Sequence, residues 1–329
     1  MRAPSSAMFG LVSCLLMLLG GCAERLPKAP VTEGDVVQII EANHGWVNVD
    51  PDLPRSPVVA VHLTLLTSDP KAVLPHLDRL KHLKTLSLRG APVRDEDLEC
   101  LPSLPGLEHL GLSRTKITDA GLACLQRVPN VQDLVLNQTY ITGAGLKYLR
   151  YLPNLRVLRL QSTRVTDEAM VHLKGLTKLR YLELGDTFIT DAGLKHVQHL
   201  RELRSLDLWL QRGITDRGLG HVGKLTQLRS LGLGGTSVTD DGLKYLEKIE
   251  RLEDVDLRQT KVTPAGIRRL RKALPHCGIS TSLPEMEVLW ATSASEGQDN
   301  DTAGRQGQSY FDGVPSGTIN PREGGNRGP

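Results

Sequence analysis

Residues 179–197 read LRYLELGDTFITDAGLKHV, and this stretch decides the fold. Its first half spaces leucines as L-x-x-L-x-L, so the last two leucines alternate with other residues and point to one side of a short strand. Its second half, I-T-D-x-G-L, places Thr190 and Asp191 where a side-chain oxygen can cap the start of a helix. Neither half can bury its apolar face alone, so the stretch requires neighbours of the same kind.

The pattern recurs along most of the chain at steps of 24 or 25 residues. The motif, with valine replacing leucine in places, begins at Leu83, Leu107, Val131, Leu155, Leu179, Leu203, Leu228 and Leu252, and a degenerate copy begins at Val58. Self-similarity at such a period is the signature of a stacked repeat architecture. We therefore predict about nine coils, each built of a strand, a turn and a helix.

This signature resembles that of leucine-rich-repeat proteins over residues 58–275. The resemblance implies a right-handed α/β solenoid, or horseshoe, with a parallel sheet on the concave face and helices on the convex face. The T-D-x-G-L halves are similar to the cysteine-containing and ribonuclease-inhibitor-like repeat classes known from F-box proteins. The chain has no F-box-like segment, so the ubiquitin-ligase context does not carry over. The closer resemblance is to the exported leucine-rich-repeat proteins of environmental bacteria.

Threonine follows the strand at the position where this superfamily usually has asparagine or cysteine. These residues are Thr115, Thr139, Thr163, Thr187, Thr236 and Thr260. A buried hydroxyl must find a hydrogen-bond partner. We therefore expect a structural ladder of hydroxyls that bond the backbone of adjacent coils.

The N-terminus has the parts of an export signal. Arg2 is the only charge in residues 1–21, and the mostly apolar run over 8–19 is too short to span a bilayer. The segment Leu19-Gly20-Gly21-Cys22 resembles the bacterial lipobox, which implies cleavage after Gly21 and a lipid anchor on Cys22. Ordinary signal cleavage beside an incidental cysteine is the alternative. We expect an exported, membrane-anchored lipoprotein of the bacterial cell envelope, facing the periplasm or the cell surface.

The remaining segments differ in composition. We expect a signal peptide over 1–21, a tether over 22–31, an N-terminal cap over 32–57, the solenoid over 58–275, a C-terminal cap over 276–283 and a disordered tail over 284–329. The caps are required because a solenoid cannot leave its first and last coils bare. Within the N-terminal cap, residues 34–43 read as an amphipathic helix and residues 46–49 as a strand. Glycine and polar residues dominate the tail, which has no period.

Composition and motifs argue against several function classes. Hydrophobic residues make up 40% of the chain and aromatic residues only 4%, so the core must be aliphatic. A net charge of +3 is too near neutral to predict nucleic-acid binding. The sequence lacks a phosphate-binding loop, H-E-x-x-H, paired C-x-x-C and G-x-S-x-G. We therefore expect no enzyme, no cofactor and no nucleic-acid partner, and we expect a monomer.

Two sets of side chains repeat in register along the helices. Cys100 and Cys124 lie 24 residues apart, but helix axes about 8–10 Å apart exceed the Cα separation of about 7 Å that a disulfide allows, which favours two thiols. His172, His196 and His221 share one helical position. A metal would need them to converge at about 2 Å, whereas helices on the convex side spread them apart, so we expect packing roles.

The concave face is the default binding surface of this architecture. The third, fifth and seventh residues of each motif face it, and most of them are small or polar. One cluster differs, namely Arg159, Tyr181, Glu183, Asp207 and Trp209. Arginine and aromatic residues are enriched in binding hot spots, and the acids predict a partner with basic groups. The alternative is that the extra residue of the 25-residue unit bends Trp209 back and buries it.

These features predict a protein-binding module with a protein partner of unknown identity. The alternative is a structural or adhesion protein of the envelope that contacts polysaccharide.

Overall fold

The computed structural model describes residues 31–64 and 70–282, and these form a stack of coils. The described strands are β1 (Trp46–Val49), β2 (Val58–His62), β3 (Thr85–Ser87), β4 (His109–Gly111), β5 (Asp133–Val135), β6 (Val157–Arg159), β7 (Tyr181–Glu183), β8 (Ser205–Asp207), β9 (Ser230–Gly232), β10 (Asp254–Asp256) and β11 (Gly278–Ser280). They form one sheet in chain order, and every pair from β2 to β11 is parallel. The predicted α/β solenoid is confirmed. The predicted signal peptide, Cys22 and the tail lie outside the described residues.

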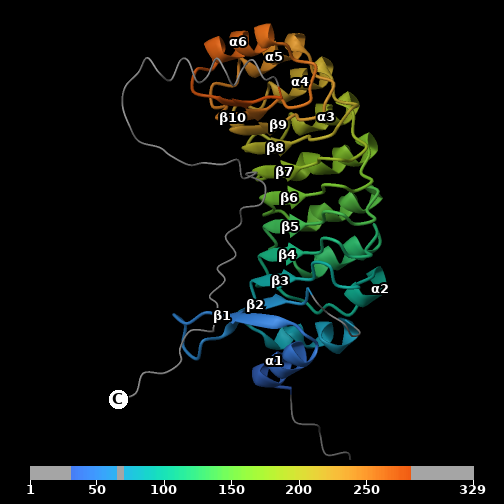
Figure 1. Cartoon of the computed structure of the whole chain (residues 1–329). Coiled ribbons are helices and arrows are strands. Elements are labelled where there is room, and N and C mark those ends of the chain that lie inside the picture. The colour runs from blue at the N-terminus through green and yellow to red at the C-terminus, as the bar shows by residue number, and fades with distance from the viewer. Residues whose placement is uncertain (1–30, 65–69, 283–329) are drawn as a thin grey trace, which may run out of the picture. The chain divides into compact units, whose positions relative to one another are not determined.

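Helices return the chain from each strand to the next. The described helices are α1 (Glu33–Ala42), η1 (Pro70–Ala72), η2 (Leu74–Arg79), α2 (Asp95–Leu98), η3 (Gly121–Arg127), η4 (Ala144–Tyr151), η5 (Asp167–Gly175), α3 (Asp191–Val197), α4 (Asp216–Val222), α5 (Asp240–Leu246) and α6 (Pro264–Ala273), where η marks a 3₁₀ helix. Figure 1 shows the strands as one layer of the stack and the helices as the other. Residues on successive strands therefore lie side by side on the face that the helices do not cover.

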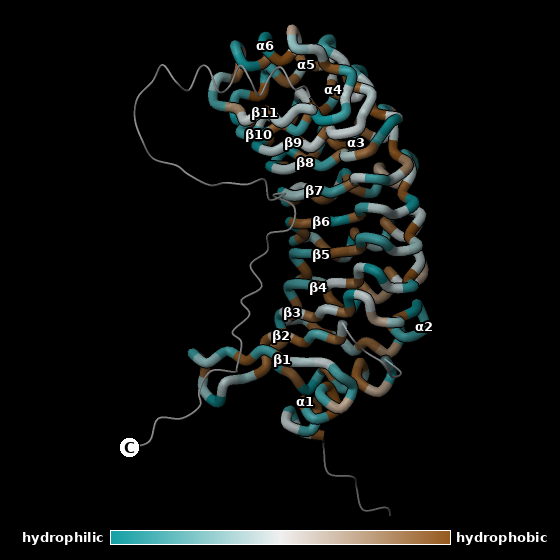
Figure 2. The backbone as a smooth tube through the Cα atoms, in the orientation of Figure 1, coloured by the Kyte–Doolittle hydropathy of each residue, from teal (hydrophilic) through white to brown (hydrophobic). Residues whose placement is uncertain are grey.

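The core is aliphatic, as the composition predicts. The three leucines of the quoted motif, Leu179, Leu182 and Leu184, are at most 1% exposed. Hydrophobic residues recur in every coil along the stack (Figure 2), and the leucines among them are buried. Each coil thus buries its leucines against the neighbouring coils, which is where most of the stability of a stacked repeat arises.

A hydrogen-bond ladder between coils explains the T-D-x-G-L motif. The amide and hydroxyl of Thr215 donate to the two carboxylate oxygens of Asp191 in the preceding coil, at 2.8 and 2.6 Å. The same bonds join Asp95 to Thr118, Asp119 to Thr142, Asp167 to Thr190, Asp216 to Thr239 and Asp240 to Thr263. The sequence predicts a capping role for both residues. The structure divides the roles: threonine caps its own helix in α3 to α6, and aspartate binds the next coil.

The glycine of the motif makes room for this ladder. A Cβ on Gly218 would collide with Oδ1 of Asp191, and the equivalent glycines face the aspartate of the preceding coil in the same way. Two neighbouring coils depart from the pattern: Gly143 stands where the aspartate of the first coil is expected, and Ala169 stands where the glycine of the next coil is expected. A Cβ on Gly143 would collide with that of Ala169. The two departures therefore compensate each other.

The threonine hydroxyls behave differently from the prediction. Each donates to the carbonyl three residues before it in its own coil, as Thr115 does to Leu112 at 2.7 Å and Thr163 to Leu160 at 2.6 Å. The prediction of hydrogen bonds to the backbone of adjacent coils was therefore wrong. The physical reason is local: the turn after the strand brings that carbonyl within reach, so the hydroxyl closes the turn.

The first coil is covered by a helix and an antiparallel strand. Thr32 caps α1 in a capping box with Asp35, and Val36 and Ile40 are fully buried. Strand β1 pairs antiparallel with β2, and the Trp46 ring stacks on that of His62 with centroids 4.9 Å apart. The helix and strand expected over 34–43 and 46–49 are thus present.

The cysteines in the described residues are free thiols. Cys100 is half-buried, and Cys124 and Cys277 are buried. Burial raises the pKa of the Cys124 thiol to about 12 and that of Cys277 to about 11. The thiols expected at positions 100 and 124 are both free, and burial disfavours the reactive thiolate form of Cys124.

Candidate functional site

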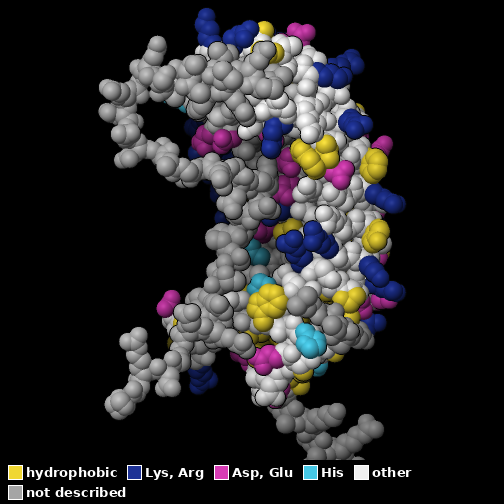
Figure 3. Space-filling model, in the orientation of Figure 1, with side chains coloured by type: hydrophobic (Ala, Val, Ile, Leu, Met, Phe, Trp, Pro, Cys, Tyr) yellow, Lys and Arg dark blue, Asp and Glu magenta, His cyan; other side chains and the backbone are white. Residues whose placement is uncertain are grey.

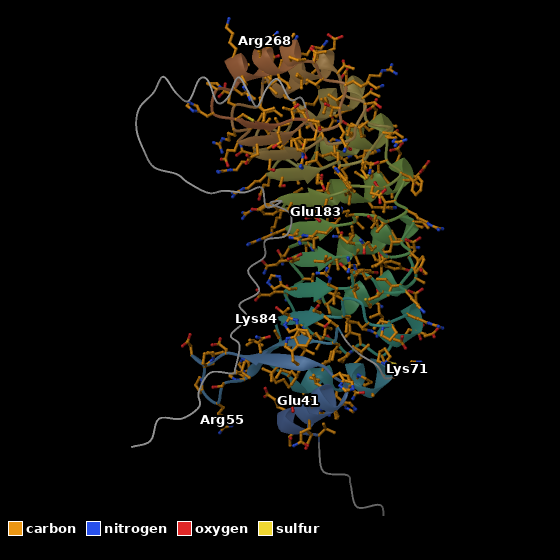
Figure 4. The ribbon with its side chains drawn as sticks, viewed as in Figure 1. Glu41, Arg55, Lys71, Lys84, Glu183 and Arg268 are labelled. Carbon is orange, nitrogen blue, oxygen red and sulfur yellow. The ribbon has the colours of Figure 1, made fainter. Side chains whose placement is uncertain are left out.

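The sheet places four of the five predicted site residues on neighbouring strands, and Trp209 follows β8 in the next turn. Arg159 ends β6, Tyr181 and Glu183 begin and end β7, and Asp207 ends β8. The strand register sets Arg159 opposite Glu183, and Glu183 opposite Asp207. The three charged residues therefore form one row across the sheet. Glu183 lies in the middle of the strand layer (Figure 4).

The cluster combines exposed aromatic rings with buried acids. Tyr181 is 46% exposed and Trp209 is 39% exposed. Glu183 and Asp207, which lie between them, are only 7% and 6% exposed. The rings are therefore available to a partner. The carboxylates lie below the exposed surface, so only a side chain that inserts between the rings would reach them.

Trp209 keeps its place in the coil despite the extra residue of its unit. Its carbonyl accepts from the amide of Asp186 at 2.8 Å, so the ladder continues through it. The extra residue falls later, between Gln211, which occupies the threonine position, and Ile214. A Cβ on Gly234 would lie 2.9 Å from Cδ1 of Trp209, so the indole rests against a glycine of the next coil. Its exposure argues against the alternative in which the extra residue buries it.

Gln211 is a site-supporting residue that the sequence analysis did not single out. Its side-chain amide donates to the carbonyl of Leu184 and to the hydroxyl of Thr187, both at 2.5 Å. A threonine at this position would bond only within its own coil. Gln211 therefore fastens the coil of Trp209 to the coil of Tyr181.

Burial raises the pKa of both acids. It raises the pKa of Glu183 to about 7, against the opposing effect of Arg159, and it raises the pKa of Asp207 to about 6. The charge of Asp207 raises the pKa of Glu183 further. Asp207 accepts a hydrogen bond from the amide of Trp209 at 3.0 Å, which only partly offsets its burial. Perturbed acids of this kind cluster at functional sites.

The contacts around Glu183 leave hydrogen-bonding groups unused. Nε of Arg159 lies 3.1 Å from Oε1 of Glu183, but the Nε–H group is buried and has no hydrogen-bond acceptor. Asn137 donates weakly to Oε2 of Glu183, at 3.5 Å. The ion pair is therefore poorly formed, and a partner group could complete it.

A second charged pair, not singled out from the sequence, lies in the neighbouring row of the sheet, which is the row of Tyr181. His109 Nδ1 lies 3.6 Å from Oδ2 of Asp133, and this carboxylate raises the pKa of His109. Asp133 is 9% exposed, and its Oδ1 atom is buried without a partner. The sequence does carry a signal, because His109 and Asp133 are the third residues of two consecutive motifs. Position in the motif alone does not reveal that Asp133 is buried.

The rest of the described surface shows mixed charge. Lys and Arg side chains project from the helix side, with Asp and Glu side chains between them (Figure 3). Within residues 31–64 and 70–282, no three His, Cys, Asp or Glu side chains are placed to hold a metal ion. The helices of this part of the chain are too short or too polar to cross a membrane.

Comparison with known proteins gives the fold but not a close relative. A leucine-rich-repeat family model matches residues 79–101. The structure is similar to the internalin InlC2 of Listeria monocytogenes, with a TM-score of 0.52 and 19% identity over 77% of this chain and 98% of that one. The sequence has no significant match among curated proteins.

Two further solved structures are similar at lower scores. The internalin InlF of Listeria monocytogenes has a TM-score of 0.47 and 20% identity, over 67% of this chain and 75% of that one. A leucine-rich-repeat protein of Leptospira interrogans has a TM-score of 0.42 and 22% identity, over 63% of this chain and 62% of that one. The chain has the α/β solenoid fold of leucine-rich-repeat proteins.

Proposed function

We propose that this chain is a non-enzymatic protein-binding module, tethered to the bacterial cell envelope through a lipid on Cys22. Its partner docks on the concave face over Tyr181 and Trp209, and presents basic groups to Glu183 and Asp207. One observation carries this proposal: two exposed aromatic rings flank two buried acids whose burial is unfavourable to the carboxylate form.

Energetics support a binding role for the cluster. Aromatic residues with a rigid, half-exposed ring supply much of the energy of protein interfaces. A basic side chain from a partner would favour the ionised acids and would be paired in a dry environment, where charge-assisted hydrogen bonds are strong. The surface is therefore suited to a lysine or arginine held between two rings.

Changing Tyr181 and Trp209 together to alanine is expected to abolish capture of the partner. Each ring is an anchor of the kind whose loss weakens binding by about tenfold or more. The measurement is crosslinking of wild type and double variant in intact native cells, followed by mass spectrometry of the captured chains. Circular dichroism and cell fractionation must first show that both proteins fold and localise alike.

A matched control is Leu53→Ala with Val171→Ala, because these side chains are 38% and 47% exposed and lie away from the cluster. This variant is expected to capture the partner as well as wild type does. Equal capture by the Tyr181→Ala/Trp209→Ala variant would contradict the proposed site. Capture of no protein by wild type would favour the polysaccharide or structural function instead.

Changing Cys22 to serine is expected to release the protein from the membrane fraction. The thiol carries the first acyl chains in the lipobox interpretation, and several buried chains, at about 0.8 kcal/mol per methylene, anchor the protein stably. Metabolic labelling with an alkyne fatty acid measures the modification, and Cys100→Ser serves as the control. Labelling of the Cys22→Ser protein at the wild-type level would contradict the anchor.

A further inference from the structure

Four exposed side chains form a stripe along the edge of the stack, on the turn that follows each strand. Lys116, Tyr140, Arg164 and Phe188 each come directly after the threonine position in four consecutive coils. Tyr140 is 57% exposed and Phe188 is 65% exposed, and both cations are exposed as well. We name these four residues the edge stripe. Basic and aromatic side chains alternate along it.

Backbone hydrogen bonds fix the spacing of the edge stripe. The amide of each residue donates to a carbonyl of the preceding coil, and these acceptors are Val93, Ile117, Ile141 and Val165, at 2.9, 3.0, 2.9 and 2.9 Å. The coils are therefore held at the β-ladder distance of about 4.8 Å at this edge. Side chains two coils apart are about 10 Å apart. The ladder is interrupted at Arg212 and Gly213, where the extra residue lies.

The edge stripe has no evident role in stability. The residue that follows each member, namely Ile117, Ile141, Val165 or Ile189, is at most 1% exposed and supplies the packing. Among the described residues, the Lys116 and Arg164 side chains form no ion pair, and no ring contact involves Tyr140 or Phe188. The coil of β9 has Ser237 at this position, so a small polar residue suffices for the fold.

From this pattern we propose that the edge stripe binds an acidic amphipathic α-helix of a partner protein, which lies across the four coils. A helix rises 1.5 Å per residue, so positions i, i+4, i+7 and i+11 of one face lie at about 0, 6, 10 and 16 Å. The edge stripe presents its side chains at about 0, 5, 10 and 14 Å. Acids at i and i+7 then meet Lys116 and Arg164, while apolar residues at i+4 and i+11 meet Tyr140 and Phe188.

An extended peptide fits this surface less well. Residues on one face of a strand repeat about every 6.7 Å, so they fall out of register with the coils within two steps. Charge complementarity also selects the partner, because the two free cations require acids opposite them. This surface is separate from the Tyr181 and Trp209 site, and the inference does not depend on the function proposed for that site.

The test uses a synthetic helical peptide with glutamate at i and i+7 and leucine at i+4 and i+11, titrated by fluorescence anisotropy onto the full chain. The control peptide has the same composition with the acids moved to the opposite face. We expect saturable binding of the first peptide only. Phe188→Ala and Arg164→Glu are each expected to weaken it about tenfold. Binding to the Arg164→Glu protein should be recovered when lysine replaces the glutamate at i+7.

Matched controls are Val171→Ala and Arg201→Glu, which change an exposed apolar and an exposed basic residue elsewhere. They should leave the affinity unchanged. Absence of saturable binding below about 1 mM would overturn the proposal, as would equal binding of the two peptides. Binding of oligothymidylate or polygalacturonate that is lost in the same variants, without helix binding, would overturn it in favour of another anionic polymer.

Discussion

Replacing Gly218 by alanine is expected to lower the free energy of unfolding by about 3 kcal/mol, although alanine is the better helix former. The new Cβ would collide with Oδ1 of Asp191 and lie 2.9 Å from Cδ1 of Leu194. Asp191 cannot withdraw freely, because it accepts two hydrogen bonds from Thr215. Moving it would forfeit bonds worth about 1 kcal/mol each in addition to the steric cost.

Gly220 is the matched control, because it lies two residues away in the same helix, α4. A Cβ there would contact only the Tyr245 ring, at 3.6 Å or more, which is ordinary van der Waals distance. Gly220→Ala should therefore stabilise the protein by about 0.8–1 kcal/mol through helix propensity. Urea denaturation followed by circular dichroism compares the two. Equal effects of both substitutions would contradict the packing argument.

The neighbouring coils that hold Gly143 and Ala169 suggest how to relieve the clash. The double variant Asp191→Gly/Gly218→Ala reproduces that natural combination in another pair of neighbouring coils. It should lose less stability than the sum of the two single variants, since the colliding atom is absent, and coupling of this kind is measured by a double-mutant cycle. Strict additivity would show that Asp191 is not the obstacle.

The fold could be predicted from the sequence because its information is local and repeated. The spacing of Leu179, Leu182 and Leu184 predicts the strand and its buried side. The step of 24 or 25 residues between motifs predicts that the coils stack. The reason for the T-D-x-G-L motif could not be predicted. Asp191 and its hydrogen-bond partner Thr215 lie 24 residues apart. A capping role within one coil would explain the threonine and aspartate of the motif equally well.

The candidate site was predictable in its members but not in its chemistry. The positions of Tyr181 and Trp209 in the motif, third and seventh, predicted that they face the concave side, and both rings are exposed. The burial of Glu183 depends on neighbours such as Asn137, which lies 46 residues earlier and reaches it from two strands away. Sequence spacing within a unit does not report such contacts.

Changing Asp207 to asparagine is expected to stabilise the protein by about 3 kcal/mol at pH 8. Burial raises the pKa of Asp207 from 3.8 to about 6, and two pKa units correspond to about 3 kcal/mol. The folded pKa lies above the unfolded one, so the unfolded state loses its proton first as the pH rises from 3.8. The free energy of unfolding therefore falls as the pH rises from 3.8 to about 6, and the loss is complete above pH 6.

Asparagine removes that penalty while keeping the local geometry. Its side-chain carbonyl can accept the hydrogen bond that the Trp209 amide now donates to Asp207 Oδ1 at 3.0 Å. The gain should shrink to less than about 1 kcal/mol near pH 4, where the carboxyl group is protonated in much of the unfolded state as well. Asp52→Asn is the control, because that residue is exposed and its change should have little effect at either pH.

The measurement is urea denaturation of wild type, Asp207→Asn and Asp52→Asn at pH 4 and pH 8, combined with the crosslinking assay. If Asp207→Asn gains stability at pH 8 and loses the partner, the carboxylate is retained for binding at a cost in stability, as is common at functional sites. A loss of stability at pH 8 would instead show that the carboxylate supports the fold. The buried acid would then give no support to the concave site, and the proposal of a binding site there would rest on Tyr181 and Trp209 alone.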